Sequence, residues 1–226
     1  MAARQTRRAE RGRGPGSRGS QVYEALLERI RSRELKPGMR IREEDVATLL
    51  GVSRTPVREA LARLQERGLV ESAGGGLAVA EVSRRQVVEL YAMRATLEGA
   101  AARLAAENAS SAEVANIKRI AGWFVEKGRS PADAAGANAA LHDAICEAAH
   151  NRYLLRMLDD LNDSLALLPE TTFSVEGRTA TAEQEHAAIV SAIEAHDPAA
   201  AESAARRHID QALEARLALI FAPPSP

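Results

Sequence analysis

The stretch GVSRTPVREALARLQERGLV, residues 51–70, decides the fold of the first part of the chain. Two arginines, Arg54 and Arg58, stand one helical turn apart behind a turn of small residues. At 100° per residue the apolar and the polar side chains separate into two faces. The apolar face consists of Val57, Ala60, Leu61 and Leu64, and the opposite face of Arg54, Thr55, Arg58, Ala62 and Gln65. This helix is therefore predicted to expose a basic, polar face.

The residues before this helix predict a second helix joined to it by a tight turn. EEDVATLL, residues 43–50, has helical spacing, and Gly51 is suited to end a helix in the left-handed conformation. Ser53 is a favourable N-cap, and Pro56 still falls in the first turn, where proline is tolerated. Two helices that meet at a short turn containing glycine are typical of a helix-turn-helix.

The flanking segments complete a winged helix. Residues 21–33 predict a helix that ends before Pro37 and Gly38. After the stretch quoted above, LVESAGGGLAVAEV predicts two short β segments around residues 74–76. A small hairpin that directly follows a helix-turn-helix is a wing, so residues 21–82 are expected to form one domain.

The rest of the chain predicts an all-helical bundle. Apolar residues recur at intervals of three and four, which favours helices over strands. About six segments are expected, with breaks at Asn108, Pro131, Asn151, residues 169–178 and Asp197. They cover roughly 84–107, 111–127, 131–150, 152–168, 180–195 and 198–219. The fold class is thus mainly α, with a winged helix-turn-helix at residues 21–82 and a helical bundle at 83–220.

Charge and composition limit the class of protein. The formal net charge is −1, but residues 1–20 hold six arginines against one glutamate. This segment is expected to be a disordered basic tail, either simply solvated or touching phosphate, and residues 221–226 a short C-terminal tail. A single cysteine, Cys146, fits a reducing compartment, and no apolar run reaches the roughly 18 residues that span a bilayer. We expect a cytoplasmic protein without a membrane partner.

The exposed basic face predicts contact with double-stranded DNA. A helix fits the major groove, and arginine can pair with the O6 and N7 atoms of guanine. Arg54 and Arg58 are placed for such contacts, and Thr55 can reach a phosphate or a thymine methyl group. The alternative is that both arginines only solvate an ordinary helix, but the turn and the wing favour the DNA interpretation.

Three histidines lie on apolar stripes of three separate predicted helices: His142, His186 and His208. Each could be a buried histidine with its own hydrogen-bond partners. Alternatively, one metal ion could bind all three, and Asn138, four residues before His142, could add an oxygen ligand. The pattern alone leaves both possibilities open.

LGVSRTPVREALARLQERGLV, residues 50–70, with the glycine-containing hairpin that follows, resembles the winged helix of GntR-type bacterial transcription regulators. The resemblance implies that Arg54, Thr55 and Arg58 touch DNA and that Gly76, matching the wing-tip glycine, enters the minor groove. This wing departs from the pattern, since Ala73, Gly74 and Gly75 stand where relatives often carry arginine or proline.

Three later stretches resemble the ligand-binding FCD domain of the FadR branch of these regulators. They are LYAMRATLEGAAARLAA, NAALHDAICEAAHN and EQEHAAIVSAIEAHDPAAAESAARRH. The resemblance implies a divalent metal ion (zinc, nickel or manganese) held by Asn138, His142, His186 and His208. It also implies that Arg94 points into the ligand cavity and can meet a carboxylate of the effector. The spacing of Arg94 and Glu98, four residues apart, allows an ion pair on the helix surface instead.

Together these features predict a homodimeric transcription regulator, most often a repressor in the resembled family, and not an enzyme. Two recognition helices related by a twofold axis would read a palindromic operator. A small organic acid bound at the metal site would be the effector. A metal-dependent hydrolase and a sensor of the metal ion itself are the alternatives; the first lacks an HExxH motif or another obvious general base.

Overall fold

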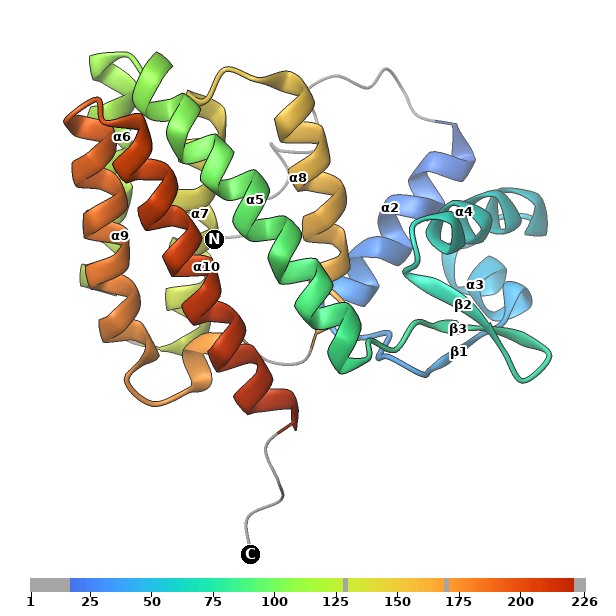
Figure 1. Ribbon diagram of the computed structural model, residues 1–226. Helices are drawn as coiled ribbons and strands as arrows, with labels where there is room; N and C mark the ends of the chain where they lie inside the picture. Colours follow the sequence, from blue (N-terminus) through green and yellow to red (C-terminus); the bar gives the residue numbers. More distant parts are fainter. Residues whose placement is uncertain (1–16, 128–129, 169–170, 222–226) are drawn as a thin grey trace, which may run out of the picture. The chain divides into compact units, whose positions relative to one another are not determined.

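The computed structural model describes residues 17–127, 130–168 and 171–221 (Figure 1). Contacts divide the chain into two units, Met1–Glu81 and Val82–Pro226. Of the two expected tails, residues 1–16 and 222–226 lie outside the described residues. Each unit buries apolar side chains of its own.

The N-terminal unit combines three helices with a small antiparallel sheet. Its elements are α2 (Arg18–Arg31), β1 (Arg40–Ile41), α3 (Glu43–Leu50), α4 (Arg54–Glu66), β2 (Val70–Ala73) and β3 (Gly76–Val79). The strand order is β1-β3-β2, so the last strand lies in the middle of the sheet. The winged helix-turn-helix expected from the sequence is confirmed.

The first helix begins earlier than expected. The side chain of Ser17 accepts a hydrogen bond from the backbone N–H of Ser20 at 3.2 Å and so caps α2. This cap starts the helix at Arg18, and residues 18–20, assigned above to the basic tail, therefore belong to α2.

The turn between α3 and α4 has the predicted form. Gly51 ends α3 with a φ of 64°, in the left-handed region that favours glycine. Ser53 stands at the N-cap position of α4, but its side chain makes no capping hydrogen bond there. The predicted apolar face of α4 is buried, with Val57, Ala60, Leu61 and Leu64 at most 1% exposed.

The wing is a hairpin with a third strand at its side. Gly74 and Gly75 have φ values of 54° and 78° and connect β2 to β3, as a two-residue type I′ turn requires. The strand β1 was not expected, because two residues are too few to show an alternating pattern. Arg40 and Ile41 of this strand pair with Ala78 and Leu77 of β3.

The C-terminal unit consists of helices only. They are α5 (Arg84–Asn108), α6 (Ser111–Lys127), α7 (Pro131–Ala148), α8 (Arg152–Leu165), α9 (Arg178–Glu194) and α10 (Pro198–Phe221), with a 3-10 turn, η1 (Thr172–Ser174), before α9. These six α-helices of the described residues confirm the predicted helical domain. Side-chain caps start several of them; Ser83, for example, forms a capping box with Gln86.

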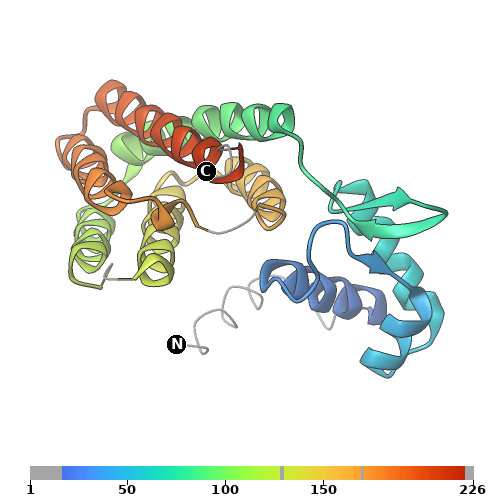
Figure 2. The ribbon, with the colours of Figure 1, turned by 90° about the horizontal axis from the view of Figure 1, so that it is seen from below.

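The long helices α5 and α10 run side by side in opposite directions in both ribbon views (Figures 1 and 2). Gly99 lets them approach closely, because a Cβ atom there would lie 3.0 Å from Cγ of Arg206. One apolar cluster of this unit joins residues of α5, α6, α7, α9 and α10. No helix of the described residues is long and apolar enough to cross a membrane.

Candidate nucleic-acid interface and metal centre

The outer face of α4 is exposed over its first turns. Arg54, Thr55 and Arg58 are exposed, with 52% and 62% of the two arginine side chains open to solvent. Their position at the N-terminal end of the second helix of a helix-turn-helix is the one from which side chains reach base edges.

An acidic pair at the start of α3 holds these arginines. The Nε atom of Arg58 donates to Oε2 of Glu43 at 2.7 Å, and Nη2 of Arg54 donates to the same oxygen at 3.2 Å. Nη1 of Arg54 also donates to Glu44 at 3.0 Å. The hydrogen bond from Arg58 lowers the pKa of Glu43 below its usual value. Exposed ion pairs of this kind are weak, so DNA can replace the carboxylates.

The predicted wing residue Gly76 is exposed but is the first residue of β3 rather than part of the turn. Gly74 and Gly75 form the tip. The guanidinium of Arg40, on the unexpected strand β1, donates to the carbonyl of Gly74. A basic side chain therefore does lie at this wing, although it comes from another strand than the hairpin itself.

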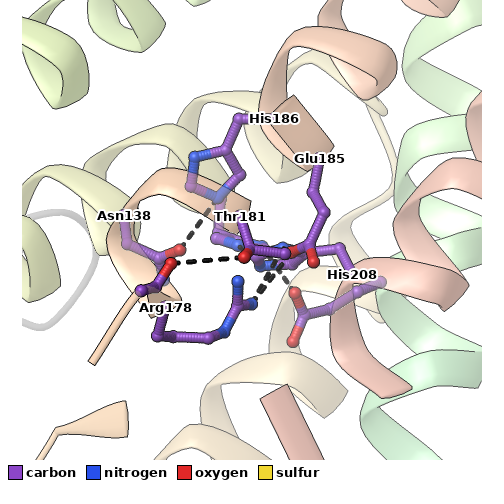
Figure 3. A network of polar contacts seen from close by, with 9 residues as sticks. Asn138, Arg178, Thr181, Glu185, His186 and His208 are labelled. Carbon is purple, nitrogen blue, oxygen red and sulfur yellow. Dashed lines mark hydrogen bonds and ion pairs between the residues drawn. The ribbon is translucent and has the colours of Figure 1, made fainter. Parts of the chain in front are cut away.

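The three predicted histidines converge inside the C-terminal unit. Figure 3 shows two of them, His186 and His208, together with Asn138. His142 comes from α7, His186 from α9 and His208 from α10. Each ring offers one nitrogen, and these three nitrogens all lie within 4.8 Å of one another. His186 and His208 are each only 2% exposed. Burial lowers the pKa of both, and neighbouring charges lower it further, which favours the neutral imidazole that binds metals.

Two glutamates orient two of these rings. Nδ1 of His142 lies 2.5 Å from Oε2 of Glu98, and Nδ1 of His208 lies 2.7 Å from Oε2 of Glu185. A carboxylate beside Nδ1 keeps the proton there and leaves Nε2 as an acceptor. The Nε2 atoms of His142 and His208 are 3.1 Å apart. Two acceptors that face each other at this distance repel unless a proton or a metal ion lies between them.

The remaining distances also fit a metal ion. Nε2 of His186 lies 3.0 Å from Oδ1 of Asn138. Adjacent ligand atoms of a six-coordinate ion, each about 2.1 Å from it, lie about 3.0 Å apart. The His142–His208 and His186–Asn138 distances are thus those of neighbouring ligands around one ion.

Arg94 forms the ion pair that the sequence allowed, but in the interior rather than on the surface. Its Nε atom donates to Oε1 of Glu98 at 2.8 Å, and both side chains are buried. Burial alone would raise the pKa of Glu98, but the charge of Arg94 and the hydrogen bond from His142 outweigh it and hold the pKa below its usual range. Glu98 is therefore ionised where it contacts His142.

Comparison with known families covers both units of the chain. Residues 18–79 match the family described as bacterial regulatory proteins, gntR family, and residues 89–211 match the FCD domain. The chain belongs to the GntR family and carries an FCD domain. The matches confirm the family resemblance and the order of the two modules.

Individual relatives of this GntR-family protein are transcription regulators. One, from Paenarthrobacter nicotinovorans, is named "Probable D-xylose utilization operon transcriptional repressor"; it is 33% identical over 84% of this chain and 84% of its own length. The Glc operon transcriptional activator of Escherichia coli K12 is 31% identical, over 74% and 76%. The GntR-family protein is accordingly a DNA-binding transcription regulator and not an enzyme.

A solved structure has the same fold. E. coli McbR/YncC superimposes with a TM-score of 0.71 at 24% identity, over 87% of this chain and 95% of that one.

The structure also brings in residues that the sequence did not single out for this GntR-family protein. Glu98 and Glu185 contact the histidine cluster, Arg178 lies beside it, and Glu43 holds the recognition arginines. Glu185 directly precedes His186, but no spacing shows that its carboxylate turns to His208 on another helix. Their roles depend on which helix faces meet.

Proposed function

We propose that the C-terminal unit binds one divalent metal ion through His142, His186, His208 and Asn138. The observation that carries the proposal is the pair of Nε2 atoms, on His142 and His208, which face each other at 3.1 Å while carboxylates hold both Nδ1 atoms. Without a cation this arrangement would leave buried lone pairs opposed, which is costly in a medium of low dielectric constant.

The donor set suits zinc, nickel or manganese, because imidazole nitrogen and amide oxygen serve all three. When bound, the ion supplies a double positive charge and coordination positions that the protein does not fill. The protein's contribution is to fix the rings. Glu98 and Glu185 orient His142 and His208, and the rings of His186 and Phe124 pack nearly perpendicular to each other with their centroids 4.6 Å apart.

A small organic acid at this ion is the proposed effector. Four protein ligands leave about two positions of a six-coordinate ion for carboxylate or hydroxyl oxygens. Such an acid would bridge helices α7, α9 and α10, which supply the ligands. Its preference for one packing of these helices can then alter operator binding. Arg94 remains a proposed further contact for the acid.

The proposed regulator is a homodimer that represses its operator. A recognition helix reads only a few base pairs, so two copies on a palindrome supply the specificity. Repression is supported by the relative that is named as a repressor, whereas the Glc operon relative is named as an activator. Arg54, Thr55, Arg58 and Gly76 are the proposed DNA contacts.

Metal analysis of the purified protein tests the proposal, together with a thermal-shift screen of carboxylic acids with and without metal. We expect about one ion per chain and stabilisation by an acid only in the metal-loaded protein. If the metal ion alone altered DNA binding and no acid did, the result would instead support the alternative that the protein senses the metal ion itself. Absence of any bound ion, with no thermal response to zinc, nickel or manganese, would contradict the proposal.

A further inference from the structure

Arg178 is a buried arginine with unused hydrogen-bonding capacity. It begins α9 and is 6% exposed. Its Nη2 atom donates to Oε2 of Glu185 at 2.9 Å (Figure 3). Its Nε and Nη1 atoms are buried and have no hydrogen-bond partner among the described residues. Three of the five N–H donors of this guanidinium are therefore unsatisfied, which is costly for a charged group in the interior.

The guanidinium lies beside the histidine cluster. Nη2 of Arg178 is 3.5 Å from Nδ1 of His208, whose other ring nitrogen faces His142. The proposed metal position and Arg178 are thus on opposite sides of one imidazole ring. An anion at Arg178 would also meet the N-terminal end of α9, where Gly177 at the N-cap provides no side-chain hydrogen bond.

The net charge of the histidine cluster and its charged neighbours indicates how many negative charges a ligand at this site should carry. Arg94 pairs with Glu98 and Arg178 with Glu185, and histidines that ligate a metal ion are neutral, as is Asn138. A divalent ion would therefore leave a net charge of about +2 in a largely buried site. Buried charge is stable only when it is compensated, and a dianion compensates this charge fully.

We propose that Arg178 binds a second acidic group of the effector, which makes the effector a short dicarboxylic acid. One carboxylate lies on the metal ion, and the other accepts hydrogen bonds from Nε and Nη1 of Arg178. Since one imidazole ring separates the two points, the acid is expected to be short, and a four-carbon diacid is a suitable probe. The inference rests on the proposed function, because it requires an acid at the metal.

Arg178 could instead serve only to position Glu185, and through it His208. That role uses Nη2 alone and leaves Nε and Nη1 without partners. The two roles have different consequences. Loss of a positioning residue weakens metal binding and the binding of every acid, whereas loss of an anion contact weakens only acids with a second carboxylate.

The test compares two acids that differ only at the far end. Malate and 2-hydroxybutyrate share the 2-hydroxy acid group, and malate has a carboxylate where the other has a methyl group. Their dissociation constants are measured by calorimetry on the zinc-loaded full chain, for the wild type, Arg178→Gln, Arg178→Lys and the control Arg206→Gln. Arg206 is an exposed arginine on α10. Zinc content is measured for every variant.

We expect the wild type and Arg206→Gln to bind malate about 10- to 100-fold more tightly than 2-hydroxybutyrate. Arg178→Gln should abolish this preference in the zinc-loaded protein, because it weakens malate binding more than 2-hydroxybutyrate binding, and Arg178→Lys should restore part of it. Equal binding of both acids by the wild type, or a preference that survives in Arg178→Gln, would overturn the inference and leave the metal-bound acid in place. Binding of neither acid to the zinc-loaded wild type would contradict the proposed function as well.

Discussion

Each unit of the molecule holds a cluster of arginines and glutamates, and the two clusters differ in their access to water. On α4, Arg54 and Arg58 share Glu43 at an exposed surface. In the helical bundle, Arg94 pairs with Glu98 and Arg178 with Glu185, largely away from solvent. An exposed pair contributes about 0–1 kcal/mol, whereas removing one partner of a buried pair costs about 3–5 kcal/mol. The surface cluster can therefore exchange its partners at little cost, and in our proposal the buried cluster is completed by a ligand.

The largest expected effect is the loss of operator binding in Arg58→Ala. A lost base contact costs about 1–3 kcal/mol, and a dimer on a palindrome loses it twice. Because Arg58 makes only exposed pairs, the melting temperature should not change. A gel-shift titration at constant salt measures the first effect, and thermal unfolding the second.

Arg207→Ala is the matched control, since Arg207 is an exposed arginine on α10. It should leave operator affinity unchanged. Equal affinity of Arg58→Ala and the wild type would show that the exposed cluster is an ordinary solvated surface.

The buried cluster should respond differently, through metal content and stability. His186→Asn shortens the side chain and removes a proposed ligand, so the bound metal should be lost. Since an ion at 100 times its dissociation constant stabilises by about 2.7 kcal/mol, the melting temperature should fall by about 5–10 °C. Elemental analysis and thermal unfolding measure the two effects.

His150→Asn provides the comparison within the same unit. His150 is exposed, contacts Glu113 and has a left-handed φ of 52°, which asparagine tolerates. Metal content should stay at the wild-type level in this variant. If both variants retained their metal, the three clustered histidines would be ordinary core residues.

A smaller effect is expected when the exposed cluster loses its carboxylate. Glu43→Gln removes a negative charge beside the predicted DNA contacts, so affinity for non-specific DNA should rise about 2- to 10-fold at low salt. Preference for the operator should fall, because Arg54 and Arg58 are no longer held by one oxygen. Glu44→Gln, which affects Arg54 alone, should show a weaker change. Fluorescence anisotropy at two salt concentrations measures the affinity of both variants for non-specific DNA. A lower affinity of Glu43→Gln than of the wild type would show that Glu43 does not compete with DNA phosphates for the arginines.

Local patterns in the sequence predicted the elements of both units well. Helical spacing identified the buried face of α4, and Gly51 marked the turn before it. The same spacing placed three histidines on the inner faces of three helices. Two elements of the N-terminal unit were less visible: the two-residue strand β1 has no period, and α2 begins at a serine cap within a segment of tail-like composition.

The partners of the key side chains could not be predicted, because they depend on how helices pack. Nothing within α5 shows that Glu98 would turn to His142 of α7. The spacing of Arg94 and Glu98 allowed an ion pair on the surface as one of two alternatives, whereas the structure has this pair in the interior. Likewise, nothing in the sequence around Arg178 distinguishes it from a surface arginine.

Calorimetric titration of an organic acid tests most directly whether the buried site controls the exposed one. The acid found in the thermal-shift screen is titrated into the metal-loaded protein, free and bound to its operator, and into the metal-free protein. Because linkage is reciprocal, an inducer should bind the operator complex about 5- to 150-fold more weakly than the free protein, and should not bind the metal-free protein. Equal affinity for the free protein and the operator complex, or binding that survives removal of the metal, would contradict the account.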